Sequence, residues 1–141
     1  MKITPSALLF DMDGTLTPPR QKAEIAIVRK LKELSDFAHI GIVTGSDFDY
    51  VMQQCASFFD IGGIDPEAIS IFPCNGTKNY EWFHTRWEKM HGADMVNDVI
   101  GRDTYAKILN FLFNEQAELV ANNPDIALTG TFFQYRGSML N

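Results

Sequence analysis

The sequence has little of what marks membrane, secreted or nucleic-acid-binding proteins. No apolar run approaches the roughly 18–20 residues that a membrane helix needs, and the first residues lack the apolar segment and cleavage site of a signal peptide. The formal net charge of −6 argues against non-specific nucleic-acid binding, for which a basic patch is the usual mark. We therefore expect a globular, cytoplasmic protein without a membrane or nucleic-acid partner.

Cysteine and histidine are also scarce. The two cysteines, Cys55 and Cys74, form neither a metal-binding spacing nor a disulfide framework. His39, His84 and His91 show no ligand spacing either, and we interpret them as structural or surface residues. Cys55 falls on the apolar stripe of a predicted helix, so we expect it in the core.

The first half of the chain alternates predicted strands and helices. Short apolar runs predict strands at 7–10, 39–45 and 68–73. Apolar residues at helical spacing predict helices within 20–37 and 47–60. Strands that alternate with helices indicate right-handed βαβ units and a parallel sheet, so the predicted class is α/β.

After Asn75 the composition changes, which marks a candidate domain boundary. Residues 78–96 are aromatic and charged, and their loose alternation allows a hairpin. Residues 102–120 carry an apolar stripe typical of an amphipathic helix, and 130–141 has the pattern of a strand pair.

Two aspartates stand out in "LLFDMDGTLTPPRQ" at residues 8–21. Asp11 and Asp13 follow an apolar strand, and ligands of open α/β sheets bind outside the carboxyl ends of the strands. Two carboxylates there can hold Mg²⁺, or they can act as nucleophile and general acid/base. The alternative is an acidic turn with local hydrogen bonds of its own.

These motifs resemble known families. "FDMDGTLT" resembles motif I of the haloacid dehalogenase superfamily, and "IGIVTGSD" resembles its motif II, in which a hydroxyl residue binds the transferring phosphoryl group. Thr44 is the first candidate for that role and Ser46 the second. Four blocks in order, "DGTLTPPRQK", "IGIVTGSDFDYV", "FPCNGT" and "GTFFQYRGSMLN", resemble the eukaryotic-type phosphomannomutase family of the cap-bearing branch.

The resemblance implies a role for each candidate site residue. Asp11 is the expected nucleophile that becomes the phosphoaspartate, and Asp13 the general acid/base; both are expected Mg²⁺ ligands. Arg20 is expected to bind a substrate phosphate on the core side, because guanidinium binds phosphate bidentately. Arg136 would bind the distal phosphate from the cap, and Asn141 would contact the sugar.

The resemblance also implies a fold, a reaction and partners. The expected fold is a Rossmann-like haloacid dehalogenase core, with its N-terminal part at 1–76, followed by the N-terminal part of an α+β cap at 77–141. The expected reaction interconverts mannose 6-phosphate and mannose 1-phosphate, with Mg²⁺ and a hexose 1,6-bisphosphate activator. Family members typically form homodimers through the cap.

Two other functions stay open at this stage. Thr44 stands where the mutases often have glycine, which favours a sugar-phosphate phosphatase of the same superfamily. The chain also ends before the motif III lysine, the motif IV aspartates and the later cap arginines, so we expect a C-terminally truncated protein, inactive or unstable alone. A truncated binding or dimerisation module is therefore the non-enzymatic alternative, and preference for mannose or glucose phosphate is undecided.

Overall fold

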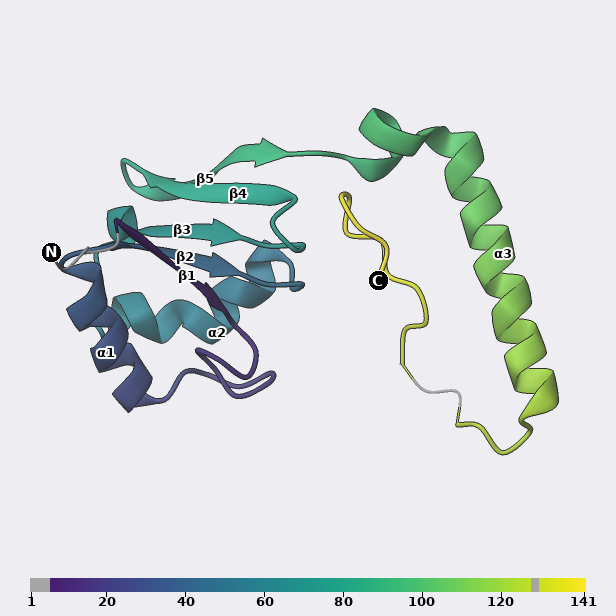
Figure 1. Cartoon of the computed structure of the whole chain (residues 1–141), viewed down its shortest axis with the longest axis horizontal. Coiled ribbons are helices and arrows are strands. Elements are labelled where there is room, and N and C mark those ends of the chain that lie inside the picture. Colours follow the sequence, from purple (N-terminus) through teal and green to yellow (C-terminus); the bar gives the residue numbers. More distant parts are fainter. Residues whose placement is uncertain (1–5, 128–129) are drawn as a thin grey trace, which may run out of the picture. The chain divides into compact units, whose positions relative to one another are not determined.

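The computed structural model describes residues 6–127 and 130–141, and its contacts divide the chain into two units, 1–92 and 93–141. The first unit contains β1 (Ala7–Asp11), α1 (Ile25–Ser35), β2 (His39–Val43), α2 (Phe48–Asp60), the 3₁₀ turn η1 (Pro66–Ala68), β3 (Ile69–Phe72), β4 (Lys78–Phe83) and β5 (Arg86–Gly92). The second contains the π-helical η2 (Met95–Ile100) and α3 (Gly101–Asn122). Figure 1 shows these elements along the chain.

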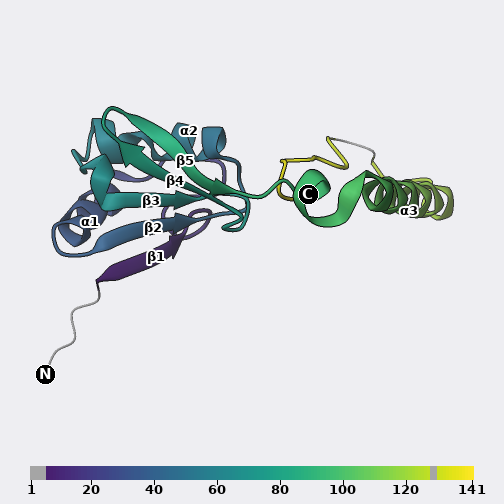
Figure 2. The ribbon, with the colours of Figure 1, turned by 90° about the horizontal axis from the view of Figure 1, so that it is seen from above.

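The first unit is built on one five-stranded sheet with the strand order β1-β2-β3-β4-β5. Figure 2 shows the strands side by side in this order. β1 pairs in parallel with β2, and β2 with β3, while β4 and β5 add two antiparallel pairings. The parallel βαβ units that the alternation predicted are therefore present, and the α/β class is confirmed.

Helices α1 and α2 cover the same face of the sheet (Figure 1). Because successive side chains of a strand point to opposite faces, every second residue of β2 and β3 meets these helices. Cys55 lies fully buried in this core, as expected from its position on the helix stripe. The cluster includes Val28 and Leu31 of α1, Val51, Cys55 and Phe58 of α2, Ile40 and Ile42 of β2, and Ile69 and Ile71 of β3.

The β4–β5 hairpin packs on the same face through aromatic rings. Tyr80 stacks on Phe48 of α2 with ring centroids 4.0 Å apart, and Trp87 meets Phe59 edge-on at 5.6 Å. The hairpin that the sequence allowed over 78–96 is therefore formed, at Lys78–Gly92. Because of these contacts and the pairing of β3 with β4, the hairpin belongs to the first unit, and the two units divide after Gly92. The boundary between core and cap that we expect after residue 76 is a different division, and it stays a prediction.

The opposite face of the sheet carries a chain of polar side chains. His39 Nε2 lies 2.6 Å from Ser70 Oγ, and this hydroxyl donates to Glu81 Oε2 at 2.8 Å. The three residues come from β2, β3 and β4 and tie these strands together. His39 therefore has the structural role that its isolated position in the sequence indicated.

The second unit is helical at its start and irregular at its end. No residue of α3 is buried, and Phe111 and Phe113 are 61% and 54% exposed. The strand pair expected at 130–141 is reduced to an isolated antiparallel bridge between Tyr135 and Leu140. Within the part of the chain that the structure describes, no helix has both the length and the apolar character needed to cross a membrane.

Candidate active site

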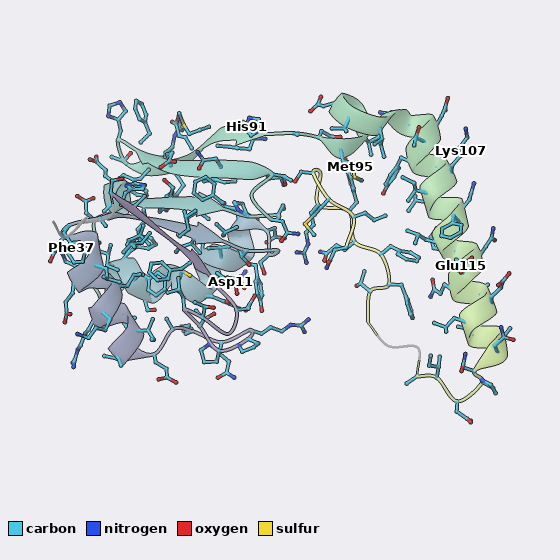
Figure 3. The ribbon with its side chains drawn as sticks, in the orientation of Figure 1. Asp11, Phe37, His91, Met95, Lys107 and Glu115 are labelled. Atoms are coloured by element: carbon cyan, nitrogen blue, oxygen red, sulfur yellow. The ribbon has the colours of Figure 1, made fainter. Side chains whose placement is uncertain are left out.

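The first parallel strands end together at one edge of the sheet. Asp11, the last residue of β1, pairs in register with Val43, the last residue of β2, and Val43 pairs with Phe72 at the end of β3. Figure 3 shows Asp11 at this end of β1. Thr44 follows β2 directly, and its amide donates to the Phe72 carbonyl at 3.2 Å. The structure therefore brings the two predicted motifs to one edge, where α/β folds bind ligands.

The alternation of the β1 backbone continues through the two aspartates. Met12 is fully buried, whereas Asp11 and Asp13 on either side of it are exposed. This arrangement is the expected consequence of a strand period of two, in which residues i and i+2 share a side. Both carboxylates are accessible to a ligand, while Met12 anchors the segment in the core.

A tight turn follows and folds back on the strand end. The Met12 carbonyl accepts hydrogen bonds from the amides of Leu16 and Thr17, both at 3.0 Å. Gly14 donates to the Thr17 carbonyl at 2.7 Å with φ of +82°, a conformation that glycine adopts without a steric penalty. Gly14 therefore permits the sharp turn that brings the chain back to the end of β1.

Arg20 is tied to Asp13 through its main chain. Its amide donates to Asp13 Oδ1 at 3.3 Å, and its φ of 58° lies in the left-handed region that non-glycine residues seldom adopt. Such strain is concentrated at functional sites. Among the described residues, the Arg20 guanidinium has no hydrogen-bond or ion-pair partner, so it is available to an anion.

The loop after β2 presents two hydroxyl groups of different accessibility. Thr44 is buried, and its Oγ1 accepts from the Ser46 amide at 3.1 Å, which leaves the Thr44 hydroxyl proton to donate elsewhere. Ser46 is half-buried. The loop after β3 holds this segment, because the Asn75 amide donates to the Thr44 carbonyl at 2.8 Å and the Cys74 amide to the Ser46 carbonyl at 2.9 Å.

Arg136 and Asn141 lie together in the second unit, within one small hairpin. The main chains of Gln134 and Asn141 exchange two hydrogen bonds of 2.8 and 3.0 Å. Arg136 Nη2 donates to Gln134 Oε1 at 2.9 Å, and its amide donates to the Met139 carbonyl. The hairpin therefore fixes both predicted ligands on the same short segment.

Comparison with known proteins identifies relatives that are similar to this chain in sequence. No protein-family model matches the chain. Phosphomannomutase 1 of Mus musculus is 31% identical over 137 residues, and that of Homo sapiens is 31% identical over 133 residues; each alignment covers 94% of this chain and 46% of the relative. The chain is homologous to the phosphomannomutases. It spans about half the length of the curated relatives it matches, including the 30% identical phosphomannomutase of Spinacia oleracea, of which it covers 48%.

Solved structures show the same fold at lower identity. Plasmodium falciparum IMP-nucleotidase matches with a TM-score of 0.69 and 13% identity over 96% of this chain and 38% of that one. Aspergillus fumigatus trehalose-6-phosphate phosphatase matches with a TM-score of 0.50 and 19% identity over 95% and 43%. These likenesses concern the fold alone, which is the haloacid dehalogenase type expected from motif I.

The phosphomannomutase homology directs attention to residues that the sequence motifs left unassigned. Asn75 has φ of 57°, and a Cβ on Gly45 would lie 3.2 Å from Asn75 Oδ1, so Asn75 borders the motif II loop. Its signal in the sequence was the Asn-Gly pair after a strand, because asparagine tolerates the left-handed conformation of turns. Gln54 of α2 gave no such signal, although its side chain reaches the motif I turn.

Cys55 is excluded as a nucleophile of this phosphomannomutase homologue. Burial, with a further contribution from the negative charge of Asp13, raises the pKa of the Cys55 thiol to about 12. The thiol is therefore neutral at physiological pH, and the thiolate is the reactive form of cysteine. Of the groups near the motif I turn, the aspartates remain the candidates for covalent chemistry.

The donor set at the strand ends suits a hard cation only in part. The described residues contain no group of three or more histidine, cysteine or carboxylate side chains placed to hold a metal ion. Asp11 and Asp13 offer accessible carboxylate oxygens, the ligand type that Mg²⁺ prefers. A Mg²⁺ ion held by one or two carboxylates keeps several waters and is completed by substrate phosphate, so the fit is to a weakly held ion.

Proposed function

We propose that the protein is a phosphomannomutase-type phosphotransferase that interconverts mannose 6-phosphate and mannose 1-phosphate through a phosphoaspartate on Asp11. The observation that carries the proposal is the exposed pair Asp11 and Asp13 at the end of β1, in a chain homologous to phosphomannomutases over 94% of its length. The hydroxyl groups of Thr44 and Ser46 after β2 lie at the same edge of the sheet and support it.

Two transfers complete the proposed reaction. An Asp11 carboxylate oxygen attacks the phosphorus of a hexose 1,6-bisphosphate, the bond from phosphorus to the sugar oxygen breaks, and Asp13 gives that oxygen its proton. The hydroxyl of the resulting or an incoming monophosphate then attacks the phosphoaspartate, loses its proton to Asp13, and restores the Asp11 carboxylate. Splitting the transfer between a nucleophile and a general acid/base is the usual logic of covalent catalysis.

Charge on the transferring group needs compensation throughout. The Thr44 hydroxyl, with Ser46 as the second candidate, would donate to phosphoryl oxygens, a type of stabilisation that provides much of the rate in phosphoryl transfer. Mg²⁺ would be held by Asp11 and Asp13 and would supply positive charge beside the phosphoryl oxygens. The hexose 1,6-bisphosphate would act as activator by supplying the first phosphoryl group.

Substrate binding and assembly belong to the same proposal. Arg20 would bind the non-reacting phosphate, supported by the absence of a partner for its guanidinium among the described residues. Arg136 would bind the distal phosphate and Asn141 the sugar. We further propose a homodimer formed through the cap region 77–141, supported by the exposed apolar residues of α3, and a cytoplasmic location.

A sugar-phosphate phosphatase is the second candidate, favoured by the Thr44 hydroxyl in motif II. It would pass the phosphoryl group from Asp11 to water instead of to a sugar. Conversion of mannose 1-phosphate that depends on hexose 1,6-bisphosphate would identify the mutase, whereas release of inorganic phosphate alone would identify the phosphatase.

The deciding experiment is to trap the phosphoenzyme. The protein is incubated with Mg²⁺ and hexose 1,6-bisphosphate carrying labelled phosphate, then quenched in acid. We expect label that hydroxylamine releases, as from an acyl phosphate, and complete loss of it in Asp11→Asn. Asp60→Asn, an exposed carboxylate at the end of α2, is the matched control and should label normally. Label that survives in Asp11→Asn would place the phosphoryl group on another residue and contradict the proposal. Absence of label from the wild-type chain would contradict it as well and would favour a binding or dimerisation module.

A further inference from the structure

A buried polar contact joins α2 to the motif I turn. Gln54 is 4% exposed, and its Oε1 accepts a hydrogen bond of 3.1 Å from Thr17 Oγ1. Thr17 is 2% exposed, so both partners are out of solvent. The residues lie 37 positions apart in the sequence, and the contact therefore fixes the turn against a helix of the core.

Thr17 in turn closes the loop that carries Asp13. Its amide donates to the Met12 carbonyl at 3.0 Å, and its hydroxyl lies 3.3 Å from the same oxygen. Its own carbonyl accepts from the Gly14 amide at 2.7 Å, and its backbone forms a bridge with Asp13. Whatever holds Thr17 in place therefore also holds the backbone of Asp13.

If Gln54 served only to pack α2 against the motif I turn, its amide group would lower the stability of the fold. Its Nε2 is buried and has no hydrogen-bond partner within the part of the chain that the structure describes. A buried donor without a partner costs free energy, and an apolar side chain of similar length would fill the same space without that cost. A buried amide with an unpaired Nε2 is expected where the hydrogen bond to its Oε1 has a function that offsets the cost.

We propose that Gln54 is a positioning residue of the candidate active site: through Thr17 it holds the motif I turn and so fixes Asp13 relative to Asp11. The proposal rests on the phosphotransfer proposed for these two aspartates. A general acid/base must lie within hydrogen-bond reach of the proton it moves, and small displacements of a reacting group cost large factors in rate. Gln54 acts through Thr17 and does not touch the substrate.

Two pairs of variants of the full chain separate positioning from packing. Thr17→Val keeps the shape and removes the hydroxyl, whereas Thr17→Ser keeps the hydroxyl and removes a methyl group. Gln54→Met keeps the length and removes the amide, and Gln53→Met makes the same change at the exposed neighbouring position on α2. If the contact positions the turn, Thr17→Val and Gln54→Met act alike, and combining them adds nothing.

Hydrogen exchange is the readout that does not depend on the proposed chemistry. We expect the amides of Gly14 and Thr17 to exchange roughly 10-fold faster or more in Thr17→Val and Gln54→Met, with Ile42 and Ile71 of the sheet unchanged. Thr17→Ser and Gln53→Met should match the wild type. Equal acceleration in the turn and the sheet would mean a merely structural role, and no acceleration would mean no role; either result overturns the proposal.

The rate of phosphoenzyme formation is the second readout. At saturating hexose 1,6-bisphosphate we expect Thr17→Val and Gln54→Met to label roughly 10-fold or more slowly, with an unchanged half-saturating concentration and with rescue in Thr17→Ser. Labelling at the wild-type rate in both variants would overturn the proposal. If the wild type itself takes no label, the phosphotransfer proposal has failed, while the exchange experiment still decides whether Gln54 holds the turn.

Discussion

The two units of the chain treat their apolar residues differently. In the first unit, α1, α2 and the sheet bury a continuous cluster that includes Phe58, Ile42 and Ile71 without measurable exposure. In the second, no residue of the described ranges 93–127 and 130–141 is buried, although α3 is the longest helix of the chain. Similar helical patterns in the sequence thus have different outcomes.

The difference shows that an amphipathic pattern predicts a helix but not its burial. An apolar stripe is buried only where a second layer of secondary structure lies against it, because domains are built from packed layers. The sheet provides that layer for α1 and α2. Among the described residues of its own unit, α3 lies against η2 and the irregular segment before Asn141 and against no sheet, so most of its apolar residues remain accessible.

The largest contrast is expected in thiol reactivity. Cys55 is fully buried with its pKa raised to about 12, whereas a cysteine in place of Leu119, which is 52% exposed, would be accessible. With ordinary domain stabilities of about 5 kcal/mol or more, we expect Cys55 to react with a thiol reagent at least ~1000-fold more slowly than the Leu119→Cys thiol. Peptide mapping after timed labelling measures both rates.

The pH dependence of labelling tests the cause. Because the pKa of the Cys55 thiol lies well above this range, its thiolate fraction rises tenfold per pH unit, so native Cys55 should gain roughly 100-fold in reactivity between about pH 7 and 9. An exposed thiol with a pKa near 8.5 approaches full ionisation over the same range and should gain only about 25-fold. Equal labelling rates at Cys55 and at the Leu119→Cys thiol would show that the first unit opens as readily as the second, which would contradict the difference in packing between the two units.

Truncating one aromatic side chain in each unit should produce the next largest difference. Phe58→Ala removes a fully buried ring from the core, and we expect a loss of about 3–5 kcal/mol in the free energy of unfolding of the first unit. Phe113→Ala removes a ring that is 54% exposed, and we expect a change of about 0.5 kcal/mol or less. Native-state hydrogen exchange reports each unit separately; comparable losses would contradict the contrast in packing.

Much of the first unit followed from the sequence because its signals are local. The apolar runs ending at Asp11 and at Val43 predicted strands, and βαβ alternation made their carboxyl ends meet. The aspartate pair and the hydroxyl after β2 were therefore brought to one edge as expected. Their catalytic roles remain proposals, since geometry at a strand end permits several kinds of chemistry.

Other features had no local signal. The tie between Gln54 and Thr17 spans 37 residues and depends on how α2 packs on the sheet, which periodicity does not specify. The αL backbone of Arg20, which directs its amide to Asp13, lies in a segment without a repeating pattern. The end of the chain reads as two strands by composition, but only Tyr135 and Leu140 form a bridge, because isolated pairs of strands gain little from pairing alone.

Two glycine substitutions test how tightly the first unit is packed. A Cβ on Gly62 would lie 2.6 Å from the Phe58 carbonyl oxygen and 2.5 Å from Val28 Cγ1, so backbone must move, and we expect Gly62→Ala to cost about 1–3 kcal/mol. A Cβ on Gly41 would meet Leu9 Cδ2 at 2.3 Å, but Leu9 is mostly exposed and can change rotamer. We expect Gly41→Ala to cost less than about 1 kcal/mol. Urea unfolding of both variants measures the order, and a reversed order would contradict the packing described.

The smallest effect is expected at the start of the second unit, where Asp94 caps η2. Its Oδ1 accepts from the amides of Val96 and Asn97 and from the Tyr135 hydroxyl. The Asn97 amide, followed by the Tyr135 hydroxyl, holds the pKa of Asp94 below its usual value. The folded carboxyl thus binds a proton less readily than the unfolded one. Its contribution to stability is therefore complete above the unfolded pKa and lost as pH falls through the folded pKa.

Asp94→Asn isolates the charge from the cap, because asparagine caps helices about as well as aspartate. In the wild type we expect the amide resonances of Val96 and Asn97 to shift as pH falls below about 4, in a single step. In Asp94→Asn this step should disappear while both amides keep their protection at pH 7. Glu115→Gln, on the exposed side of α3, should leave the step unchanged. A step that persists in Asp94→Asn would assign the titration to another carboxyl, so the cap would then hold the second unit by its hydrogen bonds alone.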